Sequence, residues 1–201
     1  MTKIIAISNE KGGTGKTTTA VNLAAVFHNF GNRVLLIDSD PQMNATSSLG
    51  CNGRNENNYA DLLNDTKDAR QCVLHTDYCD LIPASARLGV AEKILASQGN
   101  HYRLAEALNF LDEYDYVIVD SSPMQLVADA EEMSHLCDTN LLVVRQHMVE
   151  ARDLNEAIDI LNGIQKKLLG VVFNNVHTSA HGIRTSYDYG YDYGYGGNNG
   201  R

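Results

Sequence analysis

Residues 10 to 18 read E-K-G-G-T-G-K-T-T, and this stretch decides the fold of the chain. Its glycines and its terminal Gly15-Lys16-Thr17 are typical of a phosphate-binding loop, whose backbone N–H groups cradle the β- and γ-phosphates of a nucleotide. We expect Lys16 to reach the same oxygens and the Thr17 hydroxyl to coordinate Mg²⁺. The sequence therefore predicts a site for ATP and Mg²⁺ whose nucleotide contacts come from Gly12, Gly13, Thr14, Gly15, Lys16, Thr17 and Thr18.

The segments on either side of the loop have the patterns that a phosphate-binding loop requires. Residues 4–7 are an apolar run of the kind that forms a buried strand, and residues 17–30 carry the apolar side chains of a helix. The N-terminus of that helix would face the phosphates and favour their negative charge. The alternative, a glycine turn with a lysine nearby by chance, does not explain why strand, loop and helix follow in this order.

Strand and helix patterns alternate through the rest of the chain. Further apolar runs predict strands, and two further segments with apolar faces predict helices. Continuous apolar strands between helices are typical of a doubly wound, mostly parallel α/β sheet with helices on both faces, the fold of P-loop nucleoside triphosphatases. The predicted strands are residues 4–7, 34–37, 80–83, 116–120, 141–144 and 168–173, and the predicted helices are residues 17–30, 104–111 and 151–165.

Length and composition limit the classes of protein to consider. The 201 residues fit one domain, which we place at residues 1–182, followed by a tail at residues 183–201. The chain has no long apolar run and no signal-peptide pattern, and its four scattered cysteines are typical of reduced thiols in the cytoplasm. The net charge of −9 disfavours nucleic acid as a partner, although the fold could still gather dispersed basic residues into a patch.

Three aspartates follow or end predicted strands. Asp38 and Asp40 come directly after one apolar strand and Asp120 ends another, so all three lie at the edge where ligands bind in such sheets. Phosphoryl transfer needs a metal ion to neutralise developing charge and a group that orients or deprotonates the nucleophile. Asp38 and Asp40 suit these tasks, and Asp120 stands where a carboxylate holds Mg²⁺ through water. Alternatively, Asp38 or Asp40 caps a helix that begins near Gln42, and Asp120 ends its strand by chance.

The loop departs from the general phosphate-loop pattern, because Glu10 replaces the first glycine and Lys11 precedes the glycine pair. In this it resembles the ParA/MinD family of partitioning and septum-site ATPases, as does D-S-D-P-Q-M-N-A-T at residues 38–46. The resemblance implies that Lys11 reaches across the interface of an ATP-dependent homodimer or homo-oligomer to the partner's nucleotide. It also assigns the attacking hydroxyl or water to Asp40 and a place in the magnesium shell to Asp38. Lys11 could instead be a solvated loop cation. The candidate catalytic residues are therefore Lys16, Asp40 and Lys11.

The second half of the chain is similar to the bacterial tyrosine kinases of capsule and exopolysaccharide synthesis. This resemblance implies that Asn174 contacts the nucleotide base, although an asparagine there is also typical of a turn. The chain departs from those kinases in three ways: it has Pro41-Gln42 where they carry an arginine, it has Lys11, and it shows no E-x-x-R-x-x-R segment for ring assembly. The matching segments are D-Y-V-I-V-D-S-S-P at 115–123, Asp129-Ala130, Asp138, L-L-V-V-R at 141–145 and L-G-V-V-F-N-N-V at 169–176.

Residues 186–197 read S-Y-D-Y-G-Y-D-Y-G-Y-G-G and contain half of the ten tyrosines in the chain. The glycines and aspartates between the tyrosines disfavour a stable strand and predict a flexible tail. The kinases that the chain resembles carry such a cluster and autophosphorylate on it, and each phosphate adds roughly −1.5 to −2 charges at neutral pH. The alternative is a low-complexity tail that binds aromatic groups or is simply solvated. The expected phosphoacceptors are Tyr187, Tyr189, Tyr191, Tyr193 and Tyr195.

These observations predict a cytoplasmic, ATP- and Mg²⁺-dependent phosphoryl-transfer protein. The kinase resemblance favours a tyrosine autokinase that regulates capsular or exopolysaccharide synthesis, with a membrane-bound activator or adaptor that brings the protein to the membrane. The first alternative is an ATPase switch of the partitioning type, in which ATP dimerises the protein and hydrolysis releases it. The second alternative is a nucleotide-bound scaffold without catalysis, which binds partners through its tail.

Overall fold

The computed structural model describes residues 1–9, 11–51, 57–64, 68–89, 112–121, 137–163 and 167–177. The expected helix 104–111, the kinase-like pair Asp129-Ala130 and the tyrosine tail at 183–201 lie outside these ranges. The expected nucleotide and metal residues from Lys11 to Asn174 all lie inside them. The candidate site can therefore be built from described residues alone.

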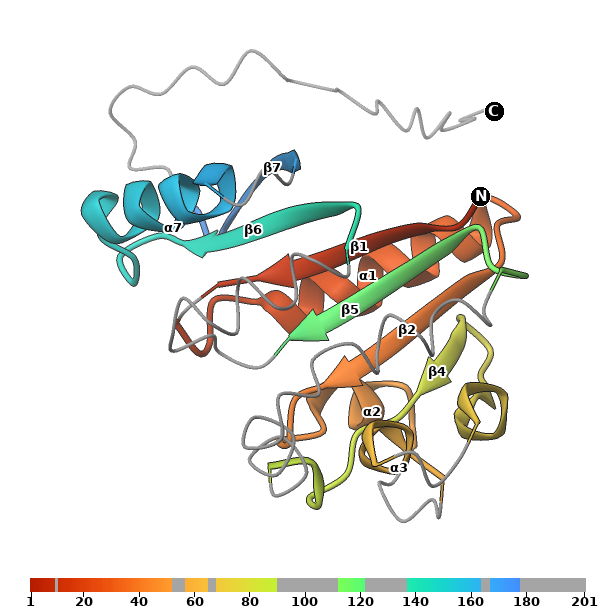
Figure 1. The fold of residues 1–201 in the computed structure, drawn as a ribbon. Helices are drawn as coiled ribbons and strands as arrows, with labels where there is room; N and C mark the ends of the chain where they lie inside the picture. Colours follow the sequence, from red (N-terminus) through yellow and green to blue (C-terminus); the bar gives the residue numbers. More distant parts are fainter. Residues whose placement is uncertain are drawn as a thin grey trace, which may run out of the picture.

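Seven strands form one sheet in the order β3-β4-β2-β5-β1-β6-β7 (Figure 1). The strands are β1 (Lys3–Ser8), β2 (Val34–Ser39), β3 (Leu74–His75), β4 (Asp80–Ile82), β5 (Tyr116–Ser121), β6 (Thr139–Arg145) and β7 (Lys167–Asn174). Every neighbouring pair is parallel except β3 and β4, which are antiparallel. This confirms the predicted mostly parallel sheet. The sequence pattern missed β3, because two residues are too few to show an alternation.

Helices cover both faces of the sheet. The described helices are α1 (Lys16–Asn29), α2 (Asn44–Ser48), α3 (Tyr59–Leu63), the 3₁₀ helix η1 (Ala69–Cys72) and α7 (Ala151–Gly163). Buried residues of α1 and α2 share a cluster with Ile7 and Val143, whereas α3 and η1 pack in a second cluster with Ala6 and Ile37. Because successive strand residues point to opposite faces, these clusters lie on opposite sides of the sheet. The doubly wound architecture is therefore confirmed.

Apolar runs form the central strands because both faces of the sheet are covered. All six residues of β2 are buried, and Leu35, Leu36 and Ile37 are fully buried. A strand that is covered on both faces needs such a continuous apolar run rather than an alternating one. The parallel register of β2 and β5 then pairs Asp38 with Asp120, so the fold brings two predicted acids to the same edge.

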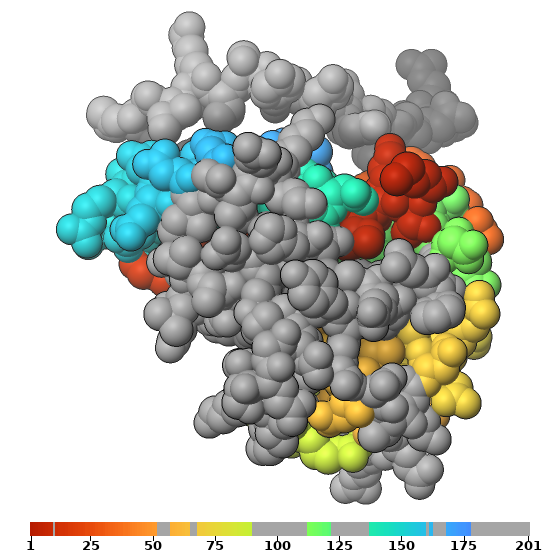
Figure 2. Space-filling view, viewed as in Figure 1, coloured from red at the N-terminus to blue at the C-terminus, as the bar shows by residue number. Residues whose placement is uncertain are grey.

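The region of α7 and the first residues of the chain are among the parts that lie at the surface on the side that Figure 2 shows. The outer side of α7 is coloured blue there and the first residues of the chain are coloured red. Arg152 and Glu156 of α7 are exposed, whereas Leu161 is buried. The helix is therefore amphipathic, as the period of its apolar residues predicts.

The cysteines of the chain are free thiols. No disulfide joins Cys51, Cys72, Cys79 and Cys137, in agreement with the reduced thiols that the sequence predicts. Burial raises the pKa of the Cys79 thiol to about 12, so this side chain behaves as a core residue and not as a nucleophile. Within the described ranges, no helix is both long enough and apolar enough to span a bilayer.

Candidate nucleotide-binding site

The loop between β1 and α1 has the backbone shape of an anion cradle. Gly13 and Gly15 have φ angles of 72° and 103°, in the left-handed region that favours glycine. A side chain at Gly15 is disfavoured for a second reason, because its Cβ atom would clash with Nδ2 of Asn174 and that side chain would have to move. Gly15 is also the N-cap of α1, and no side chain caps the first turn. The first N–H groups of α1 are therefore available to an anion such as phosphate.

Two side chains from the ends of β6 and β7 hold the loop. Arg145 Nη1 donates a hydrogen bond to the carbonyl oxygen of Gly13 at 3.0 Å, and Asn174 Nδ2 donates one to that of Thr14 at 2.9 Å. Hydrogen bonds within the chain thus attach the loop to the ends of β6 and β7. The predicted contact between Asn174 and a nucleotide base stays a prediction, and the contact seen in the structure is with the loop.

Asn9 ties the beginning of the loop to the sheet. Its side-chain nitrogen donates to the carbonyl oxygen of Val143, and its Oδ1 accepts a hydrogen bond from the backbone N–H of Lys11 at 2.9 Å. Only 6% of Asn9 is exposed. The sequence pattern does not single out Asn9, because an asparagine directly after a strand is also common in ordinary turns.

Lys16 is buried inside the loop. It is 6% exposed, and its Nζ donates a hydrogen bond to the carbonyl oxygen of Lys11 at 3.1 Å. Burial lowers the pKa of Lys16, and the negative charges of Asp120 and Asp40 oppose this effect. The ammonium group is therefore near two of the three predicted acids: Asp120, which lies in β5, and Asp40, which directly follows β2.

Asp120 has the features of a carboxylate that can take a cation. Both oxygens are buried, and neither has a hydrogen-bond partner of normal geometry among the described residues. Burial raises the pKa of Asp120 to about 7, with the Thr17 side chain as the strongest opposing influence. A buried carboxylate without a well-formed hydrogen bond is stabilised by a further cation, so Asp120 and the nearby Thr17 hydroxyl fit Mg²⁺. Within the described residues, no group of three His, Cys, Asp or Glu is placed to hold a metal ion.

Asp38 is fully buried, and its carboxylate is already bound by donors of the chain. Its Oδ2 accepts hydrogen bonds from the backbone N of Thr46 at 2.8 Å and from Thr46 Oγ1 at 2.6 Å, and its Oδ1 accepts one from the backbone N of Asp40 at 3.1 Å. Burial raises the pKa of Asp38, and the bonds from Thr46 are the first to oppose this rise. Asp38 therefore fits an outer place in a magnesium shell, reached through water.

Asp40 shapes the turn that follows β2. Its Oδ1 accepts a hydrogen bond from the backbone N of Gln42 at 2.9 Å. Its backbone carbonyl oxygen accepts a hydrogen bond from the backbone N of Met43 at 2.8 Å. The alternative that Asp40 caps a helix beginning near Gln42 is wrong, because α2 begins at Asn44, its N-cap is Met43 and no N-cap side chain bonds its first turn. The second carboxylate oxygen of Asp40 takes no part in these turn bonds and is available to a ligand.

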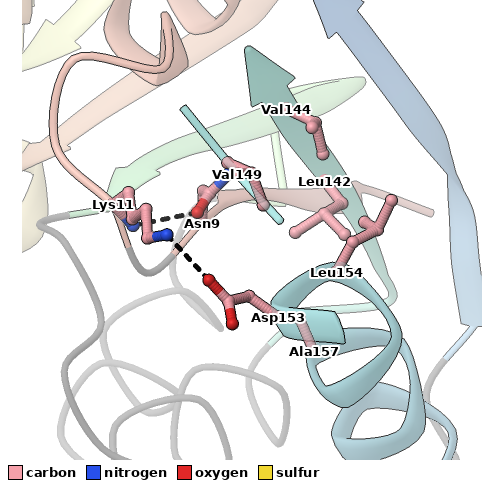
Figure 3. Close-up of a pocket in the computed structure, with 8 residues that line it drawn as sticks. All are labelled: Asn9, Lys11, Leu142, Val144, Val149, Asp153, Leu154 and Ala157. Carbon is pink, nitrogen blue, oxygen red and sulfur yellow. Dashed lines mark hydrogen bonds and ion pairs between the residues drawn. The ribbon is translucent and has the colours of Figure 1, made fainter. Parts of the chain in front are cut away.

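Lys11 lies at a small pocket between the loop, β6 and α7 (Figure 3). Its Nζ pairs with Asp153 Oδ2 at 2.7 Å, and 40% of the Lys11 side chain is exposed. The hydrogen bond from Lys11 lowers the pKa of Asp153. Lys11 is therefore bound within its own chain, and its Nζ would have to leave Asp153 to reach the nucleotide of a partner. The apolar side chains that line this pocket are Leu142, Val144, Val149, Leu154 and Ala157.

The other predicted nucleotide-contact residues belong to the same loop and the start of α1, and their side chains differ in how far they are exposed to solvent. Thr14 is buried, Thr17 is half-buried, and Gly12 and Thr18 are exposed. The structure thus gathers the loop and the three acids at one edge of the sheet, with Thr18 on the outside of α1. The predicted phosphoacceptor tyrosines lie outside the described residues.

Known proteins share this combination of loop and sheet. The AAA domain family matches residues 2–173 of the chain. The sporulation initiation inhibitor protein Soj of Bacillus subtilis (strain 168) is 36% identical over 173 residues, which cover 84% of this chain and 68% of Soj. The tyrosine-protein kinase CpsD of Streptococcus pneumoniae is 31% identical over 178 residues, which cover 88% of this chain and 78% of CpsD. The chain spans only 44% of the chromosome partitioning protein ParA of Myxococcus xanthus (strain DK1622), with 46% identity over 127 residues.

A solved structure shows the same fold with its ligands. Cobyrinic acid a,c-diamide synthase from Mycobacterium smegmatis, with a bound ATP analog and magnesium, has a TM-score of 0.79 and 29% identity, and the match covers 86% of this chain and 75% of the synthase. A synthase, a kinase and a sporulation inhibitor thus resemble one chain, and the likeness defines the family but not the reaction. Both resemblances predicted from the motifs are confirmed, and the chain belongs to the AAA domain family of ParA/MinD-like P-loop ATPases.

Proposed function

We propose that this protein binds ATP together with Mg²⁺ and transfers the γ-phosphate. The observation that carries the proposal is the position of Lys16, which is buried in the phosphate loop and interacts electrostatically with Asp120 and Asp40. The ATP analog and magnesium in the similar synthase structure support the same ligands here. Phosphoryl transfer depends mainly on positioning and on charge neutralisation, and this set of residues provides both.

Each residue has a defined task in this reaction. The N–H groups at the start of α1 and the ammonium group of Lys16 bind the phosphate oxygens and orient the γ-phosphate. Thr17 and Asp120 hold Mg²⁺, which when bound neutralises the charge that develops on those oxygens. Asp40 orients the attacking hydroxyl or water and accepts its proton through the carboxylate oxygen that the turn leaves available.

The leading acceptor in our proposal is the cluster of five tyrosines between residues 187 and 195. The similarity to CpsD, which is named as a tyrosine-protein kinase, extends over 88% of the chain and supports this choice. A phenol oxygen forms the new bond to the γ-phosphorus, the bond between that phosphorus and ADP breaks, and Asp40 takes the phenol proton. The resemblance extends the proposal to the control of capsular or exopolysaccharide synthesis with a membrane-bound activator.

Incubation of the protein with Mg²⁺ and ATP, with and without membranes of the organism that produces it, should place phosphate on these tyrosines. Exchange of all five for phenylalanine should abolish the signal and leave ATP affinity unchanged, because the tail lies apart in sequence from the loop and from the three acids. Mass spectrometry of the tail measures the first result, and titration calorimetry measures the second. Release of inorganic phosphate without any tail modification, in the presence of membranes, would instead favour hydrolysis.

A second candidate function is an ATPase switch, and Lys11 is the residue that favours it. The chain carries the extra lysine of the deviant loop, and Soj is 36% identical to it. In this alternative, ATP dimerises the protein, Lys11 of each copy reaches the nucleotide of the other, and water replaces the phenol as the attacking group. The net charge of −9 argues against DNA as the partner. In a third alternative, the protein holds nucleotide without turnover and binds partners through its tail.

Exchange of Lys11 for alanine should weaken ATP-dependent dimerisation by about tenfold and change the ATP affinity of the monomer by less than about threefold. The reason is that Lys11 Nζ lies at the outer edge of the loop, paired with Asp153, whereas Lys16 is the buried lysine of the cradle. Light scattering with and without ATP measures the dimer. Arg152→Ala is the matched control, because it removes an exposed cation beside the same aspartate. An ATP-dependent dimer of full strength in Lys11→Ala would exclude the crossing role.

A further inference from the structure

Thr46 lies at the centre of a buried hydrogen-bond network behind the candidate site. Its side chain belongs to α2 and is fully buried. Its Oγ1 donates to Asp38 Oδ2 at 2.6 Å, and its backbone N donates to the same oxygen at 2.8 Å. Its Oγ1 also accepts a hydrogen bond from the backbone N of Ala84 at 3.0 Å. One hydroxyl therefore joins the end of β2, the helix α2 and the segment that follows β4.

The chemistry of the partners fixes the direction of these bonds. A backbone N–H can only donate, so Ala84 occupies an acceptor position of the Thr46 hydroxyl. The single hydroxyl hydrogen then points to the other partner, and Asp38 receives it. Because neither bond can reverse, the hydroxyl holds the carboxylate of Asp38 in one orientation.

The same bonds also distinguish the two oxygens of Asp38. Its Oδ2 accepts both hydrogen bonds from Thr46, whereas its Oδ1 accepts only one, from the backbone N of Asp40. A carboxylate has about four acceptor positions, two on each oxygen. The remaining position is therefore on Oδ1, the oxygen that the backbone of Asp40 already contacts.

We propose that Thr46 positions Asp38 for the nucleotide's magnesium and makes Oδ1 the oxygen that is offered to the water around the metal. The proposal rests on the ATP and Mg²⁺ site proposed above and adds a residue to it. Thr46 acts through Asp38, so it is a positioning residue and not a catalytic one. Its hydroxyl links the acid to the segment after β4, whereas an ordinary helical hydroxyl would bond within its own helix.

The test compares three single variants with the wild-type chain. Thr46→Val removes the hydroxyl and keeps the shape, and Thr46→Ser keeps the hydroxyl. Ser48→Ala is the matched control, because Ser48 is an exposed residue of the same helix and its Oγ donates to the carbonyl oxygen of Asn44. The primary readout is a ratio of two ATP dissociation constants measured by calorimetry. The constant measured in EDTA, without Mg²⁺, is divided by the constant measured with Mg²⁺.

Thr46→Val should lower that ratio by about fivefold to tenfold, because one hydrogen bond to a charged group is lost. Thr46→Ser and Ser48→Ala should keep the wild-type ratio. The turnover number of Thr46→Val should fall by about tenfold while its KM for ATP stays within about threefold. In the Asp38→Asn background, Thr46→Val should add little further loss, since both changes act on one interaction.

The contrary outcomes separate this proposal from the function it rests on. If the wild-type chain shows no ATP binding, the proposed function fails. If the wild-type chain binds Mg²⁺ and ATP and a folded Thr46→Val has the same ratio and turnover, the positioning role fails alone. If Thr46→Val does not fold, Thr46→Ala carries the same comparison, because it leaves room for a water molecule in place of the hydroxyl. Failure of both variants to fold would show that the hydroxyl serves the fold and would overturn the proposal.

Discussion

Exchange of Lys16 for alanine should weaken the binding of Mg²⁺ and ATP by about 100-fold or more, which corresponds to about 3 kcal/mol for the loss of charge-assisted hydrogen bonds to phosphate. The effect is large because Lys16 is only 6% exposed and its Nζ already lies within the loop, bonded to the Lys11 carbonyl. Its removal also leaves Asp120 and Asp40 without their nearby cation, so they repel the phosphates. Titration calorimetry at 25 °C measures the affinity.

A lysine outside the site provides the control for this experiment. Lys3 lies at the other end of β1, where its Nζ stands over the Tyr116 ring at 5.9 Å from the ring centre. Lys3→Ala removes the same charge from the chain and should leave the ATP affinity unchanged. Equal affinities of Lys16→Ala and the wild-type chain would contradict the phosphate-loop assignment, provided that circular dichroism shows both to be folded.

Asp40→Asn should lower the turnover of ATP by about 100-fold or more, whether the phosphate goes to tyrosine or to water. The affinity for Mg²⁺ and ATP should change by less than about threefold, because the phosphate cradle is intact. Asparagine keeps an oxygen that can accept the hydrogen bond from the Gln42 backbone at 2.9 Å, so the turn survives while the base is lost. The measurements are phosphate release and phosphate incorporation into the tail.

Two further variants separate chemistry from structure at this position. Asp40→Ala loses both the base and the turn contact, so any difference between it and Asp40→Asn reports on the turn. Asp115→Asn is the matched control, because Asp115 also accepts a backbone hydrogen bond, from Arg33 at 2.8 Å, but precedes β5 and lies away from the site. Turnover at the wild-type rate in Asp40→Asn would leave Asp40 as a turn residue only.

Local patterns were enough to predict the phosphate loop and the sheet. The glycines of the loop are required by positive φ angles at single positions, and the apolar run of β2 is required by burial on both faces. Asp120 could be predicted as well, because a polar residue that ends an apolar strand stands at the ligand-binding edge of a parallel sheet. Each of these requirements acts within a few residues of the chain, so the sequence displays it directly.

The residues that support the site depend on contacts between distant segments. Lys11 and Asp153 are 142 positions apart, and Arg145 meets the Gly13 carbonyl across 132 positions. The helical period of residues 151–163 predicts which side of α7 is apolar, but it does not tell which loop the helix end will meet. The sequence points to Thr46 only as the last residue of the motif at residues 38–46. Its role could not be predicted, because its hydrogen-bond partner Ala84 lies in another segment.

The central place of β1 has a consequence for the synthesis of the protein. The strand leaves the ribosome before both of its neighbours, which are β5, through Lys3 and Tyr116, and β6, through Ile5 and Thr139. At roughly 5–20 residues per second, translation takes roughly 6–20 s to pass from the first strand to β5, and both hydrogen-bonding edges of β1 wait unpaired for that time. Pairings between such distant segments also make folding slow. A nascent chain therefore cannot be stabilised by ATP until β5 and β6 have emerged, and the early chain depends on its surroundings to keep this apolar strand from associating with others.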